Sequence, residues 1–170
     1  ANDESSSGNN GVVTGAALTT DRFGNTNQSY FFDGAATISA TDNNLPFGNS
    51  SRTLSAWVYC GQRQSIINNG NPAHLFKYGI ELATSNYCNT ALWGNVLRFS
   101  NNSTPPDGDY SYYHPINEWF HVLIRLNPNN RFDYFINGQL VYSADFEIWN
   151  TISIGSILYG EFLNNGKLDD

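Results

Sequence analysis

Alternation of apolar and polar residues in the last third of the chain constrains the fold most. In WFHVLIRL (residues 119–126) every second residue from Phe120 to Leu126 is apolar, the period of a pleated strand with two different faces. NPNN (residues 127–130) has the composition of a turn, and RFDYFI (residues 131–136) alternates again. Asn137-Gly138 is a strong hairpin signal, after which residues 139–143 return as a third strand. We therefore predict an antiparallel meander whose outward side chains offer a binding surface.

Short strands separated by turn residues are predicted along most of the chain. In RTLSAWVYC (residues 52–60), Leu54 and Val58 face one way, and Trp57 and Tyr59 the other. No helix of three or more turns is indicated, and the Asn-Asn-Gly segment at 164–166 is interpreted as a turn. The other predicted strands are residues 29–33, 36–40, 65–67, 75–82, 92–99 (one strand or a pair) and 152–157. Such a chain is expected to form an all-β, two-sheet antiparallel jelly-roll sandwich.

The composition favours an extracellular protein that binds polar ligands. The 170 residues carry a net charge of −7, which argues against a nucleic-acid backbone or an anionic membrane as partner. Only 14% of the residues are charged, so Asn, Ser, Thr and Gln supply most of the surface polarity. The sequence contains no run of 18 apolar residues, the length that would indicate a transmembrane helix. The composition leaves the oligomeric state open.

The two cysteines, Cys60 and Cys88, allow one disulfide in an oxidising compartment. Such a bridge would stabilise the fold by roughly 3–4 kcal/mol. The alternative is two separate buried thiols.

Residues 1–14 are expected to form a flexible tether, and residues 15–170 one domain. The start of the chain, ANDESSSGNNGVV, is acidic, rich in Ser, Gly and Asn, and lacks aromatic residues. It looks like the segment that follows the lipidated cysteine of a bacterial surface lipoprotein. An anchor upstream of Ala1 is therefore expected.

The chain resembles the laminin-G-like members of the concanavalin-A-like jelly rolls, in the form common in secreted bacterial proteins. The segments that carry the resemblance are residues 17–38, 53–58, 118–126, 134–141, 152–156 and 166–170. The resemblance implies a jelly roll, but that fold hosts lectins, glycanases, adhesins and spacers, so the function must be argued from the site.

Catalysis would require particular acidic or basic groups on one strand face. Retaining glycanases of this superfamily need two carboxylates about 5 Å apart. Among the candidate carboxylates, Asp145 and Glu147 are the one pair at i,i+2 spacing, and the further Glu of the glycanase motif is absent. The lyase variant uses a Tyr and a His, and its motifs are absent here. The remaining candidate carboxylates are Glu81, Glu118, Asp133 and Asp169.

Sugar binding fits the residue types better. Flat aromatic faces pack against the apolar faces of sugars, while amide, carboxylate and guanidinium groups bond the hydroxyls. We expect the candidates to line one concave sheet face, although the alternative for each aromatic residue is a place in the core. The candidates are Trp93, Tyr110, Tyr112, Tyr113, His121, Arg125 and Asp133.

A structural calcium ion is the cofactor that the resemblance implies. In related jelly rolls such an ion joins the first hairpin to the last strand through carboxylate and backbone oxygens. Carried onto this chain, the ligands are Asp33, Gly34 and Asp169 or Asp170.

The sequence thus predicts a non-catalytic extracellular or cell-surface module that binds a glycan or a surface protein. The alternatives are a polysaccharide-degrading hydrolase or lyase and an adhesion or spacer domain without its own ligand.

Overall fold

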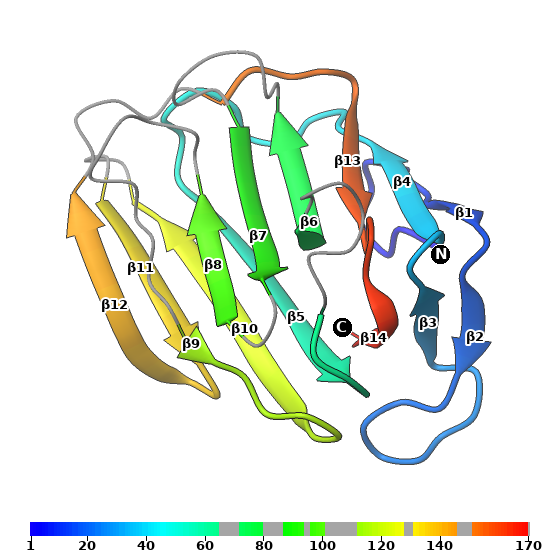
Figure 1. The fold of residues 1–170 in the computed structure, drawn as a ribbon. Coiled ribbons are helices and arrows are strands. Elements are labelled where there is room, and N and C mark those ends of the chain that lie inside the picture. Colours follow the sequence, from blue (N-terminus) through cyan, green and yellow to red (C-terminus); the bar gives the residue numbers. More distant parts are fainter. Residues whose placement is uncertain are drawn as a thin grey trace.

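The computed structural model describes residues 1–64, 72–79, 87–93, 96–100, 112–127, 131–145 and 151–169, and every regular element in them is a β-strand. The strands follow each other along the chain as shown in Figure 1. They are β1 (Val12–Thr14), β2 (Ala17–Thr19), β3 (Ser29–Asp33), β4 (Thr37–Thr41), β5 (Arg52–Cys60), β6 (Ala73–Gly79), β7 (Tyr87–Trp93), β8 (Val96–Ser100), β9 (Tyr112–Tyr113), β10 (Trp119–Leu126), β11 (Arg131–Ile136), β12 (Gln139–Asp145), β13 (Ser156–Tyr159) and β14 (Asn164–Asp169).

Two seven-stranded antiparallel sheets form a sandwich, which confirms the predicted fold class. Sheet A has the order β1-β4-β13-β6-β7-β8-β9, and sheet B the order β12-β11-β10-β5-β14-β3-β2. In Figure 1 the strands β6, β7 and β8 lie in front of β5, β10 and β11. None of the segments that the structure describes forms a helix long and apolar enough to cross a membrane.

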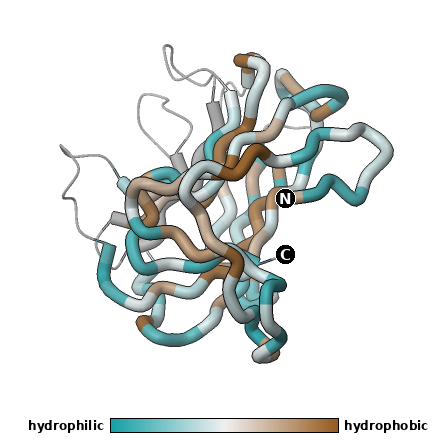
Figure 2. Tube along the Cα trace, turned by 90° about the vertical axis from the view of Figure 1, so that its right-hand side faces the viewer, coloured by the Kyte–Doolittle hydropathy of each residue, from teal (hydrophilic) through white to brown (hydrophobic). Residues whose placement is uncertain are grey.

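The predicted meander is confirmed as β10, β11 and β12, which pair in chain order. Asn137 (φ 49°) and Gly138 (φ 78°) both have positive φ, as a tight hairpin turn between right-twisted strands requires. In β10 the residues Phe120, Val122 and Ile124 are fully buried, while the residues between them are partly exposed. In Figure 2 hydrophobic and hydrophilic stretches are interleaved along the trace. One face of sheet B therefore packs into the core, and its other face, here called the outer face, is turned away from sheet A.

The structure differs from the sequence prediction at both ends of the chain. Residues 12–14, which the sequence analysis assigns to the tether, pair as β1 with β4 at the edge of sheet A. The predicted turn at 164–166 lies inside β14, where Asn165 (φ 47°) forms an irregularity between Asn164 and Gly166. A positive φ therefore marks a bulge here instead of a chain reversal.

The expected disulfide is wrong, because Cys60 is a free thiol. Cys60 ends β5 in sheet B with its side chain in the core, whereas Cys88 belongs to β7 in sheet A, in register with Tyr78. Burial raises the pKa of the Cys60 thiol to about 12, so the reactive thiolate does not form at neutral pH.

Candidate binding site

The outer face of sheet B carries an aromatic cluster at the centre of the sheet. In β5, Trp57 and Tyr59 alternate with the buried Val58 and Cys60, so both rings point outward. The same alternation in β10 turns Trp119 and His121 outward. Pairing of β5 with β10 places Tyr59 beside Trp119, and Trp57 beside His121. Four ring systems from two strands thus share one surface.

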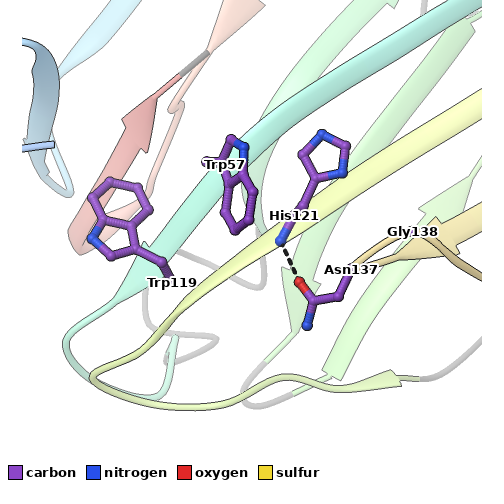
Figure 3. Close-up of a pocket in the computed structure, with 5 residues that line it drawn as sticks. All are labelled: Trp57, Trp119, His121, Asn137 and Gly138. Atoms are coloured by element: carbon purple, nitrogen blue, oxygen red, sulfur yellow. Dashed lines mark hydrogen bonds between the residues drawn. The ribbon is translucent and has the colours of Figure 1, made fainter. Parts of the chain in front are cut away.

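A pocket of about 510 Å³ opens on this surface, lined by Trp57, Trp119, His121, Asn137 and Gly138. Figure 3 shows the side chains of Trp57, Trp119 and His121 standing on β5 and β10, with the Asn137-Gly138 turn beside them. The ring centroids of Trp57 and His121 are 5.2 Å apart. The depression is shallow and widely open to solvent, so a ligand would lie on it and would not be enclosed by it.

The hairpin turn is fixed to the edge of the pocket by two hydrogen bonds. The His121 backbone N–H donates to Asn137 Oδ1 at 2.8 Å, and the Asn137 N–H donates to the His121 carbonyl oxygen at 2.9 Å. The side-chain oxygen of Asn137 is therefore occupied, and its Nδ2 group remains as a donor for a ligand.

The loop between β2 and β3 packs against the aromatic cluster through Arg22. The Arg22 guanidinium lies over the ring of Trp57, 5.0 Å from its centroid, and over that of Phe23 at 4.5 Å. Arg22 Nη1 also forms an ion pair with Asp169 Oδ2 at 2.5 Å. Asp169 belongs to β14 and lies directly opposite Trp57 of β5. This contact holds the indole in place before any ligand arrives.

The surroundings of His121 favour the neutral form of its imidazole. Burial lowers the pKa of His121, and the positive charge of Arg22 lowers it further. A neutral imidazole has one N–H donor and one acceptor nitrogen, the combination that suits a hydroxyl group.

A cluster of charged residues occupies the adjoining part of the outer face. The Asp133 carboxylate accepts hydrogen bonds from Arg125 Nη2 at 2.7 Å, from Asn127 Nδ2 at 3.0 Å, and from Ser143 Oγ. Burial alone would raise the pKa of Asp133, but the hydrogen bonds from Ser143, Arg125 and Asn127 outweigh it and lower the pKa to about 2. Asp133 is therefore an ionised structural group at neutral pH, not a proton donor.

Substitution of Asp133 by asparagine is expected to lower the free energy of unfolding at pH 7 by about 1–2 kcal/mol. The fall of the pKa from 3.8 to about 2 corresponds to roughly 2 kcal/mol, which is discounted because Arg125 is half exposed. The folded-state pKa lies below the unfolded value, so this stabilisation is complete above about pH 4 and is lost as the pH falls towards 2.

Urea denaturation of the wild type and Asp133→Asn between pH 2 and pH 7 measures this effect. The difference between the two proteins should be largest at pH 7 and shrink below pH 4. Asp145→Asn is the matched control, because Asp145 is largely exposed and lies 3.5 Å from Arg131; it should change stability by less than about 0.5 kcal/mol. A pH-independent difference for Asp133→Asn would contradict the assignment.

The predicted ligand-binding residues divide between the two sheets. His121, Arg125 and Asp133 share the outer face of sheet B, but Tyr112 and Tyr113 form β9 at the edge of sheet A, so the single face expected from the sequence is wrong. The reason is that β9 pairs with β8 and not with β10. Tyr112 packs against the core, and Tyr113 is 72% exposed. Tyr110 and the Trp93 side chain lie outside the described residues.

The residues proposed for calcium do not converge. Asp33 lies opposite Asn164 at the start of β14, and its Oδ1 accepts the N–H groups of Ala35 and Ala36. Asp169 lies five residues further along β14, roughly 15 Å away at the rise of a strand, and pairs with Arg22. Asp170 lies outside the described residues. One ion cannot contact both Asp33 and Asp169, and the described residues hold no group of three His, Cys, Asp or Glu side chains suited to a metal.

Four of the residues that line the pocket were not predicted from the sequence, namely Trp57, Trp119, Asn137 and Gly138. Their signal was present, because Trp57 and Trp119 occupy the outward phase of two alternating strands. Trp57 and Trp119 point to the same side of their strands as His121. They could have been assigned to its surface once β5 and β10 were known to be neighbours.

Similarity to known proteins is visible in the structure alone. No protein-family model and no curated protein matches the chain. The binding domain of Paraclostridial Mosquitocidal Protein 1 superposes with a TM-score of 0.75 at 17% identity, covering 98% of this chain and 44% of that one. The botulinum neurotoxin serotype G binding domain gives a TM-score of 0.74 at 15% identity, over 99% of this chain and 43% of that one.

A shorter neighbour is domain 4 of AbnA, a GH43 extracellular arabinanase from Geobacillus stearothermophilus, in complex with arabinotriose. It superposes with a TM-score of 0.64 at 18% identity, and 94% of this chain covers 79% of that domain. The present chain spans less than half the length of the toxin binding domains that it matches. At these identities the likeness establishes a shared β-sandwich fold.

Proposed function

We propose that the chain is a non-catalytic glycan-binding module and that the outer face of sheet B is its binding site. The observation that carries the proposal is the pocket in which two indole rings and a neutral imidazole meet a backbone hairpin turn. Indole faces pack against the C–H faces of sugars, and the polar groups around them bond the hydroxyls.

The arrangement of the pocket suits a ligand that is polar at its edges and apolar on its faces. Arg22 and His121 both contact the Trp57 ring and hold it in place, so little side-chain freedom is lost when a sugar contacts the part of the ring that lines the pocket. Asn137 Nδ2 and the imidazole of His121 stand at the rim as hydrogen-bonding partners. Trp side chains in such positions commonly dominate binding energy.

The fold supports the same function. The structural neighbours include toxin binding domains and a domain of an extracellular arabinanase in complex with arabinotriose. The proposal places this chain among laminin-G-like, lectin-like jelly rolls of secreted or cell-surface proteins, with a surface lipoprotein as its parent. The low content of charged residues and the pocket of aromatic and amide groups support an extracellular glycan partner.

Screening on a glycan array followed by calorimetry tests the proposal. Trp57→Ala and Trp119→Ala are each expected to weaken binding of an array hit at least tenfold, because each removes a ring face from the pocket. Tyr113→Ala is the matched control, since it removes an exposed ring from sheet A and should leave affinity unchanged. Affinity lost in Tyr113→Ala but kept in both Trp variants, or no glycan bound at all, would contradict the proposal.

A further inference from the structure

The outer face of sheet B holds more positive charge than the rest of the molecule would suggest. The chain has a net charge of −7 and only eight Lys and Arg residues. Four of the eight lie on or against this face. They are Arg22, Arg125, Arg131 and Lys167. The carboxylates of Asp133, Asp145 and Asp169 lie beside them, so these four cations and three anions give the face a net charge of about +1 in a protein whose net charge is −7. An anionic ligand therefore meets less repulsion on this face than the overall charge would impose.

Lys167 differs from the three arginines in its partners. Arg22 pairs with Asp169, Arg125 with Asp133, and Arg131 lies 3.4 Å and 3.5 Å from the carboxylates of Asp133 and Asp145. Within the described part of the chain, the Lys167 ammonium has no carboxylate partner. Its Nζ donates to Thr20 Oγ1 at 3.3 Å. An ammonium group has three donors, so two remain for a ligand.

Lys167 belongs to the same surface as the pocket. In the sheet it lies beside Tyr59, which in turn lies beside Trp119. The Lys167 Nζ is 5.2 Å from the centroid of the Tyr59 ring, and the rings of Tyr59 and Trp119 are 5.6 Å apart. Two strand spacings, about 10 Å, separate Lys167 from Trp119. That span exceeds one sugar ring, so a ligand that contacts both has at least two sugars.

We infer that the site takes an acidic oligosaccharide, with a neutral sugar in the indole pocket and a neighbouring carboxylated sugar whose carboxylate pairs with Lys167. This inference rests on the proposed function and specifies its ligand class. Tyr59 supplies the ring face between the two ends, and its hydroxyl is oriented by a hydrogen bond to Asn117 Oδ1 at 3.3 Å. The half-exposed carboxylate–ammonium pair supplies selectivity more than affinity.

Two matched pairs of sugars test the inference by calorimetry: cellobiouronic acid against cellobiose, and sialyllactose against lactose. In at least one pair we expect the carboxylated sugar to bind the wild type about fivefold more tightly than its neutral counterpart. Lys167→Gln should remove that preference and leave the affinity for the neutral sugar unchanged. Raising the salt concentration to 0.5 M should weaken the preference by screening.

Control variants separate failure of the inference from failure of the proposed function. Arg131→Gln removes a cation at the far side of the same face and should keep the preference, because Arg131 already pairs with carboxylates. Trp57→Ala should lower the affinity for both sugars of a pair. Three results would contradict the acidic ligand but leave the proposed glycan-binding function intact. They are equal affinity within both pairs, a preference that survives in Lys167→Gln, and array hits that are all neutral. Absence of any glycan ligand on the array would overturn both.

Discussion

Replacing Gly160 by alanine is expected to destabilise the fold by about 3 kcal/mol. Gly160 follows β13 with φ at +71°, where an L-residue pays roughly 1 kcal/mol. A Cβ atom at this position would lie 2.1, 2.3 and 2.6 Å from three atoms of the Phe32 ring. Phe32 is fully buried between the sheets and cannot move away without repacking, which costs a further 1–3 kcal/mol or so.

Chemical denaturation of Gly160→Ala beside Gly155→Ala separates the two contributions. Gly155 has a similar φ of +84°, but a Cβ there meets no atom within 4 Å, so this control should lose only about 1 kcal/mol. In a Phe32→Leu background the clash is smaller, and the additional loss from Gly160→Ala should shrink. Equal losses for Gly160→Ala and Gly155→Ala would show that the close approach to Phe32 is relieved without cost.

The strands of sheet B were largely predictable, because each has one buried and one exposed face. In β10 the buried Phe120, Val122 and Ile124 appear in the sequence as every second residue. Asn137-Gly138 likewise predicts its turn, because two consecutive residues that tolerate positive φ satisfy a local requirement. In both cases the residues that determine the local structure lie within a few positions of it in the sequence.

The irregularity in β14 shows where local information ends. Asn164-Asn165-Gly166 has the composition of a turn, and Asn165 does adopt a positive φ. The chain nevertheless continues as a strand, because β14 pairs on both sides, with β3 and with β5. Pairing between distant segments decided the outcome, and a local pattern does not contain it.

The candidate site required the same long-range information. Trp57 and His121 each have an outward phase that the sequence reveals, but 64 positions separate them, and their contact depends on β5 lying beside β10. Lys167 reaches Tyr59 only because β14 inserts between β3 and β5. Tyr113 was chosen as an aromatic residue close to the turn residues at 107–109, and the pairing of β9 with β8 places it on the other sheet. Residue types alone indicate which side chains could contact a sugar, whereas strand order determines which of them share a surface.

Replacing Arg52 by alanine is expected to lower the free energy of unfolding by about 3 kcal/mol. Arg52 begins β5 on the core side of sheet B and is only 8% exposed. Its guanidinium donates to the carbonyl oxygens of Pro46 at 3.1 Å, Ser50 at 3.3 Å and Gly48 at 3.4 and 3.5 Å, and to Thr151 Oγ1.

The guanidinium therefore joins the loop after β4 to the segment before β13. A hydrogen bond from a charged donor contributes roughly 1.5–3 kcal/mol, and removing the side chain also leaves a cavity beside the Tyr78 ring, over which it lies at 5.4 Å. Part of the loss is offset, because the Pro46 carbonyl keeps the Tyr78 hydroxyl and the Gly48 carbonyl keeps the Thr151 N–H. The expected effect is accordingly smaller than the sum of the bonds.

Two further variants identify the origin of the Arg52 effect in urea denaturation. Arg52→Met keeps most of the volume and loses the donors, so it should lie between the wild type and Arg52→Ala. Arg131→Ala removes a half-exposed arginine whose carboxylate contacts are long, and it should cost less than about 1 kcal/mol. If Arg52→Ala lost no more than Arg131→Ala, the loop from Pro46 to Ser50 would be held by its own backbone contacts. A wild-type value for Arg52→Met combined with a large loss in Arg52→Ala would instead assign the effect to packing, because the guanidinium bonds would then contribute nothing net.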